Sequence, residues 1–367
     1  MTVSYRCAAA LVLAAAFAFT ASPAHAQGGG KWEFEAHGGF ASATSPTGGS
    51  AGTLPAAAPL TLPFPVATPG FPQSQRVSSW FFGDGASLLN SVNTTLAPAS
   101  KITAIDPVIL GSAASHGNGA NFGFRVARRL GSRYFAEGTV DFANTALTFT
   151  QDALDGIEAT RSTFISAFRG LFISGPSPNP TVTATTSITE GSGHELLTTG
   201  VFGVDLLTHG RLIPYVVGGA GVAHVTGDLP SATITGNYTF PVPLGGIAAI
   251  NETDRMTIRV AQEANAAVGV FGGGFRYEAS PRWGMRGDVR MNIGGGSSDV
   301  LIDASPGVVT GTQGIILISP TTPSAVFSTS TVVNSSLTGP VISGLKTFSG
   351  SGSSMRTHVT GGIYFRF

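Results

Sequence analysis

Hydrophobic and polar side chains alternate along residues 355–367. Every second position is apolar or small, ending on the rings of Phe365 and Phe367, and the positions between them include Arg356, His358 and Arg366. Successive side chains of a β-strand point to opposite faces. The pattern therefore predicts a strand with one apolar face and one polar face.

Seven other segments show the same alternation, so eight strands are expected in all. Only a few residues separate the second strand from the third, the fourth from the fifth and the sixth from the seventh, whereas the other connections are long. Short turns at one end and long loops at the other are typical of antiparallel up-and-down β-barrels that cross a membrane. The expected strands are 31–41, 120–130, 134–148, 195–207, 212–226, 257–278, 283–294 and 355–367.

Two stretches within the long loops predict short helices. The sequence "DALDGIEATRSTFISAFRGLF" places Phe164, Phe168 and Phe172 four residues apart, which puts the three rings on one helical face. A second candidate is "GDGASLLNSVNTTL", residues 83–96. The rest of the loop sequence, including the proline-rich residues 53–72, is expected to be irregular.

Composition narrows the possible functions. Charged residues make up 11% of the 367 positions, against roughly 25% in an average soluble domain. The formal net charge is zero, so the chain has no excess of basic residues for a nucleic-acid partner.

The first 26 residues have the features of a secretory signal peptide. Arg6 precedes an apolar run that ends at Phe19, and Ala26 closes a small-x-small cleavage site. The only cysteine, Cys7, lies in this segment, so a mature chain of residues 27–367 has no disulfide. No later run of about 18 apolar residues occurs, which excludes a spanning helix.

Most charged residues of the expected strands lie on their polar faces. Seven acids and seven arginines occur there, with His37, His224 and His358 as further partners. Because an unpaired buried charge is strongly destabilising, this balance predicts a barrel interior filled by ion pairs. The expected interior set is Glu33, Glu35, Arg125, Arg129, Glu137, Asp141, Asp205, Arg276, Glu278, Arg286, Asp288, Arg290, Arg356 and Arg366.

Aromatic residues of the apolar faces gather near the chain ends and the short turns. A belt of rings at one height is expected where amphipathic side chains meet lipid headgroups. The alternative is a secreted β-sandwich, in which the apolar faces form the core. The expected membrane-interface aromatics are Trp32, Phe34, Tyr134, Tyr215, Phe275, Tyr277, Trp283, Phe365 and Phe367.

The signal peptide, the eight alternating segments, the loop asymmetry and the closing "GGIYFRF" resemble the small outer-membrane β-barrels of Gram-negative bacteria, of the OmpA/OmpX-like and opacity-protein type. This resemblance implies an eight-stranded transmembrane barrel with long extracellular loops and both termini in the periplasm. It also implies that the last strand, ending in Phe367, is read by the barrel-assembly machinery. The sequence leaves no room for a peptidoglycan-binding domain after that strand.

Candidate catalytic and metal sites are weak. Ser115 with His116, and Ser354 with His358, lack a recognisable third member, so no enzyme activity and no cofactor are expected. Asp152, Asp155 and Glu158 share a helical face, but their spacing is not that of a calcium loop. These acids are more simply residues of a first helical turn, so no metal is expected.

The expected function is therefore structural or surface-interacting, through adhesion or shielding by the extracellular loops, with the interior plugged by ion pairs. The alternative is a narrow channel, or a transporter that passes small hydrophobic solutes through a lateral opening. A secreted β-sandwich and a lipid-modifying barrel enzyme are further possibilities. The expected partners are outer-membrane lipid and an extracellular partner bound by the loops.

Overall fold

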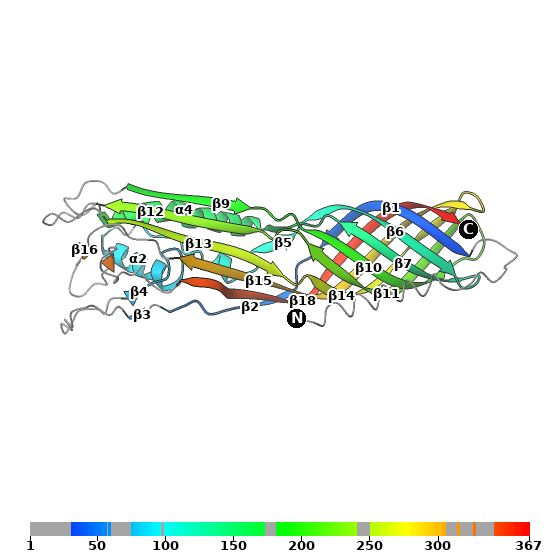
Figure 1. Ribbon diagram of the computed structural model, residues 1–367, viewed down its shortest axis with the longest axis horizontal. Coiled ribbons are helices and arrows are strands. Elements are labelled where there is room, and N and C mark those ends of the chain that lie inside the picture. Colours follow the sequence, from blue (N-terminus) through cyan, green and yellow to red (C-terminus); the bar gives the residue numbers. More distant parts are fainter. Residues whose placement is uncertain are drawn as a thin grey trace.

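A computed structural model describes residues 31–56, 58–59, 75–96, 99–172, 181–240, 250–305, 314–315, 326–327 and 341–367. The expected signal peptide and Cys7 lie outside these residues, as does most of the proline-rich run 53–72. The molecule is long, and its strands form two halves that follow one another along the long axis (Figure 1).

One half is a ring of antiparallel strands. Each strand pairs with the next along the chain, and β18 pairs with both β15 and β1, so the hydrogen-bonded ladder returns to its starting strand. The all-β, antiparallel, up-and-down prediction is therefore confirmed. The strands of the ring are β1 (Trp32–Ala43), β6 (Asn118–Arg129), β7 (Tyr134–Ala143), β10 (His194–Asp205), β11 (Leu212–Thr226), β14 (Asn265–Glu278), β15 (Trp283–Ser305) and β18 (Ile342–Arg366).

The sheet has twelve strands, and not the eight expected from the sequence. β15 and β18 continue beyond the ring, where β15 also pairs with β13 and β18 with β2. The range 257–278, expected to be one strand, contains the end of β13 and all of β14. The additional strands are β2 (Gly48–Ala51), β9 (Thr181–Thr189), β12 (Ser231–Phe240) and β13 (Ile250–Gln262).

Helices fill one side of the second half. Both expected helices are present, as α2 (Gly83–Leu96) and α4 (Gln151–Phe172), and α3 (Asp106–Ile109) lies between them in sequence. α4 packs on β9 and β12, and α2 packs on α4. The remaining short strands are β3 (Ala58–Pro59), β4 (Gln75–Arg76), β5 (Ala114–His116), β8 (Leu147–Phe149), β16 (Gly314–Ile315) and β17 (Val326–Phe327).

The second half has its own hydrophobic core, which is separate from the interior of the ring. Trp80, Phe164, Phe168 and Tyr238 are completely buried there. The rings of Phe168 and Tyr238 stack with centroids 4.3 Å apart, and Trp80 Nε1 donates to the Tyr238 hydroxyl over 3.1 Å. Aromatic packing between helix and sheet thus makes this half a compact body.

Two glycines of the ring interior are covered by aromatic rings. A Cβ atom on Gly203 would lie 2.1 Å from the ring of Phe135, and one on Gly284 would lie 2.2 Å from the ring of Tyr364. Glycine is therefore needed at both positions for these rings to pack against the strands. In the described ranges, no helix has the length and apolar character to cross a membrane.

Candidate functional site

The interior of the ring is lined by the charged face that the sequence predicts. All fourteen expected side chains form ion pairs, and eleven of them are buried, with Arg129, Glu278 and Arg366 half-buried at the end nearest the short turns. These residues face one another because each strand turns alternate side chains to the same side of the wall.

The lowest layer of pairs lies beside the short turns. Glu33 contacts Arg366 at 2.7 Å, Arg129 at 3.3 Å and Arg276 at 3.4 Å. Asp205 pairs with the last two of these arginines, at 2.9 Å with Arg129 and in a closer contact with Arg276. Glu33 also contacts Arg286 at 3.3 Å, so one carboxylate bridges arginines from four strands at this end of the interior.

The middle layer is a denser network. Arg125 contacts Glu35 at 2.9 Å, and Glu137 and Asp288 at 3.0 Å. Arg286 contacts Glu137 at 2.7 Å and Glu35 at 3.2 Å. Since each guanidinium is shared between carboxylates and each carboxylate between guanidiniums, no charge in this layer is left without an opposite charge.

Tyr215 is placed differently from the prediction. The sequence assigned it to the outward aromatic belt, but it is buried, and its hydroxyl donates to Asp288 Oδ2 over 2.8 Å. Arg286 lies over its ring, 5.2 Å from the centroid. The prediction was wrong because β11 is apolar on both faces, with Val216 exposed and Val217 buried, so hydrophobicity did not distinguish the two sides.

The upper layer contains a residue that the sequence analysis missed. Arg356 forms a short ion pair with Glu195, which is buried at the start of β10. Below them, His37 Nε2 contacts Asp141 Oδ1 at 2.5 Å. Glu195 and Asp205 are an even number of positions apart on β10, so their side chains lie on the same side of the strand. The inward face predicted from Asp205 therefore includes Glu195 when it is followed back to the start of the strand.

These layers determine what the interior can do chemically. An eight-stranded ring is about wide enough to be filled by its own side chains. Here arginines and carboxylates share it, from the short turns to the level of Glu195, with a buried cluster on β7, β10, β11 and β14 that includes Val201, Tyr215 and Val270. The arrangement closes the axis of the ring. Ion pairs connect every strand of the ring except β11 to the others, and the hydrogen bond of Tyr215 connects β11.

Eight of the nine expected interface aromatics point away from the interior. Five of these side chains are between 45 and 62% exposed: Phe34, Tyr134, Phe275, Trp283 and Phe367. The other three, Trp32, Tyr277 and Phe365, are at least partly exposed. The Trp283 and Phe365 rings are 4.8 Å apart, and Arg128 lies 5.3 Å from the Trp32 ring centroid. The exposed rings therefore form a belt around the end of the ring that carries the short turns.

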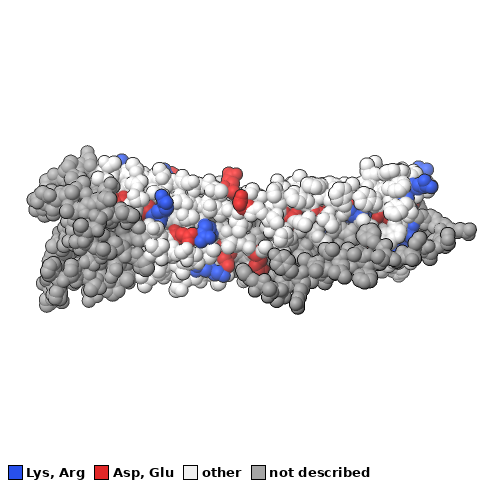
Figure 2. All heavy atoms as spheres, in the orientation of Figure 1, with Lys and Arg blue, Asp and Glu red and all other residues white. Residues whose placement is uncertain are grey.

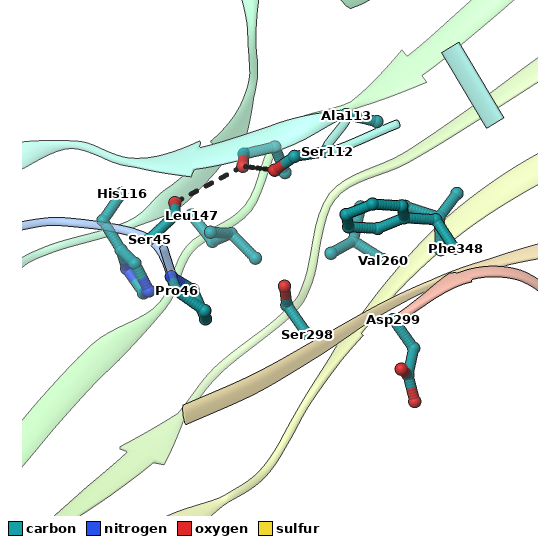
Figure 3. A pocket seen from close by; sticks show the side chains of 12 residues that line it. Ser45, Pro46, Ser112, Ala113, His116, Leu147, Val260, Ser298, Asp299 and Phe348 are labelled. Atoms are coloured by element: carbon teal, nitrogen blue, oxygen red, sulfur yellow. Dashed lines mark hydrogen bonds between the residues drawn. The ribbon is translucent and has the colours of Figure 1, made fainter. Parts of the chain in front are cut away.

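A small cavity lies where the two halves meet (Figure 3). Its polar lining includes Ser45, Ser112 and His116, and Ser45 and Ser112 both donate to the carbonyl of Ala114. Burial lowers the pKa of His116, so its imidazole is neutral at pH 7. Its two ring nitrogens face the Thr145 carbonyl and the Gln262 amide, and not Ser115, the neighbour that the sequence analysis considered.

Ser354 and His358, the second Ser–His combination that the sequence analysis considered, have other partners. His358 Nδ1 faces the Asn121 amide at 3.1 Å, and Ser354 Oγ accepts from Arg356. On α4, Asp155 accepts from Gln151, and Glu158 pairs with Arg161. Neither Ser115 with His116 nor Ser354 with His358 is arranged as a nucleophile and its base.

An open groove marks the outer surface of the ring near the second half. It is formed by small residues on β11, β14, β15 and β18, with Ile293 as its largest side chain. Ala220 and Gly269 contribute to its floor, and Gly295 and Gly352 lie at the end nearer the second half. The groove exists because glycines and alanines of these four strands place few large side chains on the outer surface here.

No protein-family description and no curated protein matches the chain. Among solved structures, the outer membrane protein OprG from Pseudomonas aeruginosa aligns over 94% of this chain and 99% of its own, with 10% identity and a TM-score of 0.36. The outer membrane protein AlkL covers 95% of this chain and 96% of its own, with 14% identity and a TM-score of 0.32. The toluene transporter TodX of P. putida covers 93% and 91%, with 9% identity and a TM-score of 0.18.

The first two are outer membrane proteins by name. At TM-scores below 0.5, these likenesses carry no argument about what this chain binds or transports.

Proposed function

We propose that the ring is an eight-stranded transmembrane β-barrel in the outer membrane of a Gram-negative bacterium. The outward face of β15 supports this, because its exposed apolar side chains run from Trp283 to Ile293 and are followed by glycines and serines. A tilted strand needs about 9–11 residues to cross a bilayer. The short turns and both termini then lie in the periplasm, and the second half stands outside the cell.

The role that the geometry supports best is that of a closed membrane anchor for a rigid extracellular body. The observation that carries it is the ion-paired interior, in which Arg125 and Arg286 together contact Glu33, Glu35, Glu137 and Asp288. A solute moving along the axis would have to separate these charges. The extracellular half then serves adhesion or shielding, and the protein has no catalytic role.

Planar-bilayer recording of the refolded protein tests the closed axis. We expect no stable conductance steps from protein that migrates faster on gels before boiling than after. Large, lasting steps from such folded protein would overturn the closed anchor. Protease treatment of intact cells is expected to cut only the extracellular half and to leave the short turns protected.

Surface interaction is tested with the core of the extracellular half. Phe168→Ala removes a fully buried ring and is expected to destabilise that half by about 3–5 kcal/mol. Phe168 belongs to the core of that half and not to the buried cluster inside the barrel, so the change in gel migration on boiling should be retained. Cells producing this variant should bind surfaces less than cells producing the parent protein; equal binding would exclude the extracellular half as the adhesive element.

The groove in the barrel wall favours a second candidate, lateral passage of small hydrophobic solutes. Gly269→Leu would place a large side chain in this groove, where a Cβ meets no atom closer than 3.7 Å. Uptake of an apolar dye by vesicles should fall in this variant if the groove is a passage. Gly138→Leu is the control, because a Cβ there meets nothing within 4 Å and the residue lies on β7, away from the groove.

Assembly completes the proposal. The terminal strand β18 carries outward Val359, Ile363 and Phe365 and ends next to Phe367. We propose that this strand is recognised by the barrel-assembly machinery. Phe367→Ser should then lower the amount of protein in the outer membrane, while protein refolded in detergent should still change its gel migration on boiling.

A further inference from the structure

Exposed cations recur at the start of every second strand of the ring. Lys31, Arg133, Arg211 and Arg282 each precede the first residue of β1, β7, β11 or β15, and all four are exposed. The three short turns contain no acidic residue. Lysine and arginine side chains are visible at this end of the molecule, on the right of Figure 2, and also on the second half.

The backbone fixes these four positions in an equivalent way. The carbonyl of Lys31 accepts from the Arg129 amide, and the carbonyl of Arg133 accepts from the Asp205 amide. The carbonyls of Arg211 and Arg282 accept in the same way from the last strand residues of β14 and β18, and all four distances are 2.8 Å. The cations therefore lie at one level around the ring, one for each pair of strands.

These cations have no carboxylate of their own. Among the described residues, none of the four forms an ion pair, whereas the acids nearest to them, Glu33, Asp205 and Glu278, are paired with interior arginines. The rim formed by Lys31, Arg133, Arg211 and Arg282 therefore has an unbalanced positive charge. The whole chain has a net charge of zero, so this positive charge is a local property of the rim.

The rim is also adjacent to the aromatic belt. Lys31 is followed by Trp32, Arg133 by Tyr134 and Arg282 by Trp283, and these rings face outward. Arg128, a further exposed cation, lies over the Trp32 ring. Since aromatic belts lie at the level of lipid headgroups, the cations are at the height of the phosphates of the adjoining leaflet.

We propose that this cationic rim binds anionic phospholipid headgroups of the periplasmic leaflet, of the phosphatidylglycerol or cardiolipin class. Guanidinium groups bind phosphate oxygens through two parallel hydrogen bonds. A ring of separate cations fits a surface of many small anions better than it fits one compact ligand. This inference rests on the proposed membrane barrel and adds the lipid class that it selects.

The tryptophans provide a local readout. The chain has three tryptophans, of which Trp80 is buried in the extracellular half, so lipid reaches Trp32 and Trp283 beside the rim. The protein is refolded in phosphatidylcholine vesicles that contain a fixed fraction of brominated phosphatidylglycerol or of brominated phosphatidylcholine, whose bromine atoms quench tryptophan. At low salt we expect brominated phosphatidylglycerol to quench more strongly than brominated phosphatidylcholine, with an association constant about five times as large.

The test variant is R133Q/R211Q/R282Q. In this variant the ratio of the association constants for phosphatidylglycerol and phosphatidylcholine should fall toward one. The ratio for the parent protein should fall in the same way at about 1 M salt, where charges are screened beyond about 3 Å. The matched control is K101Q/R169Q/R255Q, which removes three exposed cations of the extracellular half and should keep the preference. The single variants R133Q, R211Q and R282Q replace the triple variant if it does not refold.

Two results would overturn the proposal: equal quenching by the two lipids in the parent protein, or an unchanged preference in the turn variant. Inorganic phosphate is added in a parallel arm, and loss of the preference at millimolar phosphate would identify a free-phosphate site instead. Failure of the membrane barrel itself is seen separately, because such protein would not float with vesicles or change its gel migration on boiling.

Discussion

The hydroxyl of Tyr215 on β11 donates a hydrogen bond to Asp288 on β15 over 2.8 Å, across the strand that separates them. The same carboxylate contacts Arg125 at 3.0 Å and accepts from Thr360 at 2.6 Å. A single interior carboxylate thus connects four strands of the ring.

Tyr215→Phe should destabilise the barrel by about 1–2 kcal/mol, because Asp288 loses a buried donor while the ring volume is kept. Urea unfolding in lipid vesicles, followed by tryptophan fluorescence, measures this change. Tyr134→Phe is the control, since Tyr134 is 50% exposed on the outer face, and it should shift the midpoint much less. Equal shifts for the two variants would show that the interior hydrogen bond adds no stability.

Arg286→Met should destabilise the barrel by about 3–5 kcal/mol, because it leaves buried carboxylates with too few cations. Glu33, Glu35 and Glu137 all lie within 3.3 Å of this guanidinium. The same urea titration applies. Arg282→Met, at an exposed turn, should change stability by no more than about 0.5 kcal/mol, and a small effect of both substitutions would contradict a stabilising interior network.

Gly203→Ala should destabilise the barrel by about 1–3 kcal/mol, since the added methyl overlaps the Phe135 ring. Gly200→Ala in the same strand faces outward, where a Cβ meets nothing within 4 Å, and should be tolerated. The folded fraction after refolding, read from gel migration before boiling, compares the two variants. Equal yields together with equal urea midpoints would mean that Phe135 can move aside.

The extracellular half should lose stability as the pH rises from about 4 to about 7. Asp254 is completely buried, and this burial raises its pKa from 3.8 to about 7, against the lowering effect of hydrogen bonds from Trp80 N and Ser79 Oγ. Between pH 4 and pH 7 the Asp254 carboxyl keeps its proton in the folded protein and releases it in the unfolded protein. The free energy of unfolding therefore falls by up to about 4 kcal/mol by pH 7. Asp254→Asn should remove the pH dependence.

Trp80 reports this change when Trp32 and Trp283 are replaced by phenylalanine, because the chain has three tryptophans. Urea midpoints at pH 4, 5.5 and 7 give the slope. Asp303→Asn is the control: its pKa is lowered by a hydrogen bond from Arg259, so its contribution is lost below pH 4 and is constant across the window. A pH slope that persists in Asp254→Asn would assign the dependence to another group.

Alternation could predict the ring strands because their two faces differ in chemistry. Phe34 and Phe124 face outward next to inward Glu35 and Arg125, and no other secondary structure accommodates such a pattern. The fourteen interior charges followed from the same contrast. Their partners did not, because Arg356 and Glu195 are 161 positions apart and only the register of the barrel brings them together.

The strands of the second half show a weaker contrast. β9 and β12 alternate Val182, Ala184, Ile234 and Tyr238 with threonines, asparagine and serines, and both types of residue are common in loops. Their inward side is defined by α4, whose Phe164 and Phe168 cover it. The pattern of one strand could not reveal that a helix from a different loop would provide its core.

β15 and β18 each continue as one strand from the ring into the second half. Their shared ladder extends from Trp283 and Phe365 to Ala304 and Ile342, with two register shifts beyond Val300. Along these two strands the halves are joined by continuous β-structure, without a flexible linker. In the proposed orientation, an object bound at the tip would be held at a fixed distance from the cell, and a pull on it would pass as tension along the paired backbones of β15 and β18 into the wall of the ring.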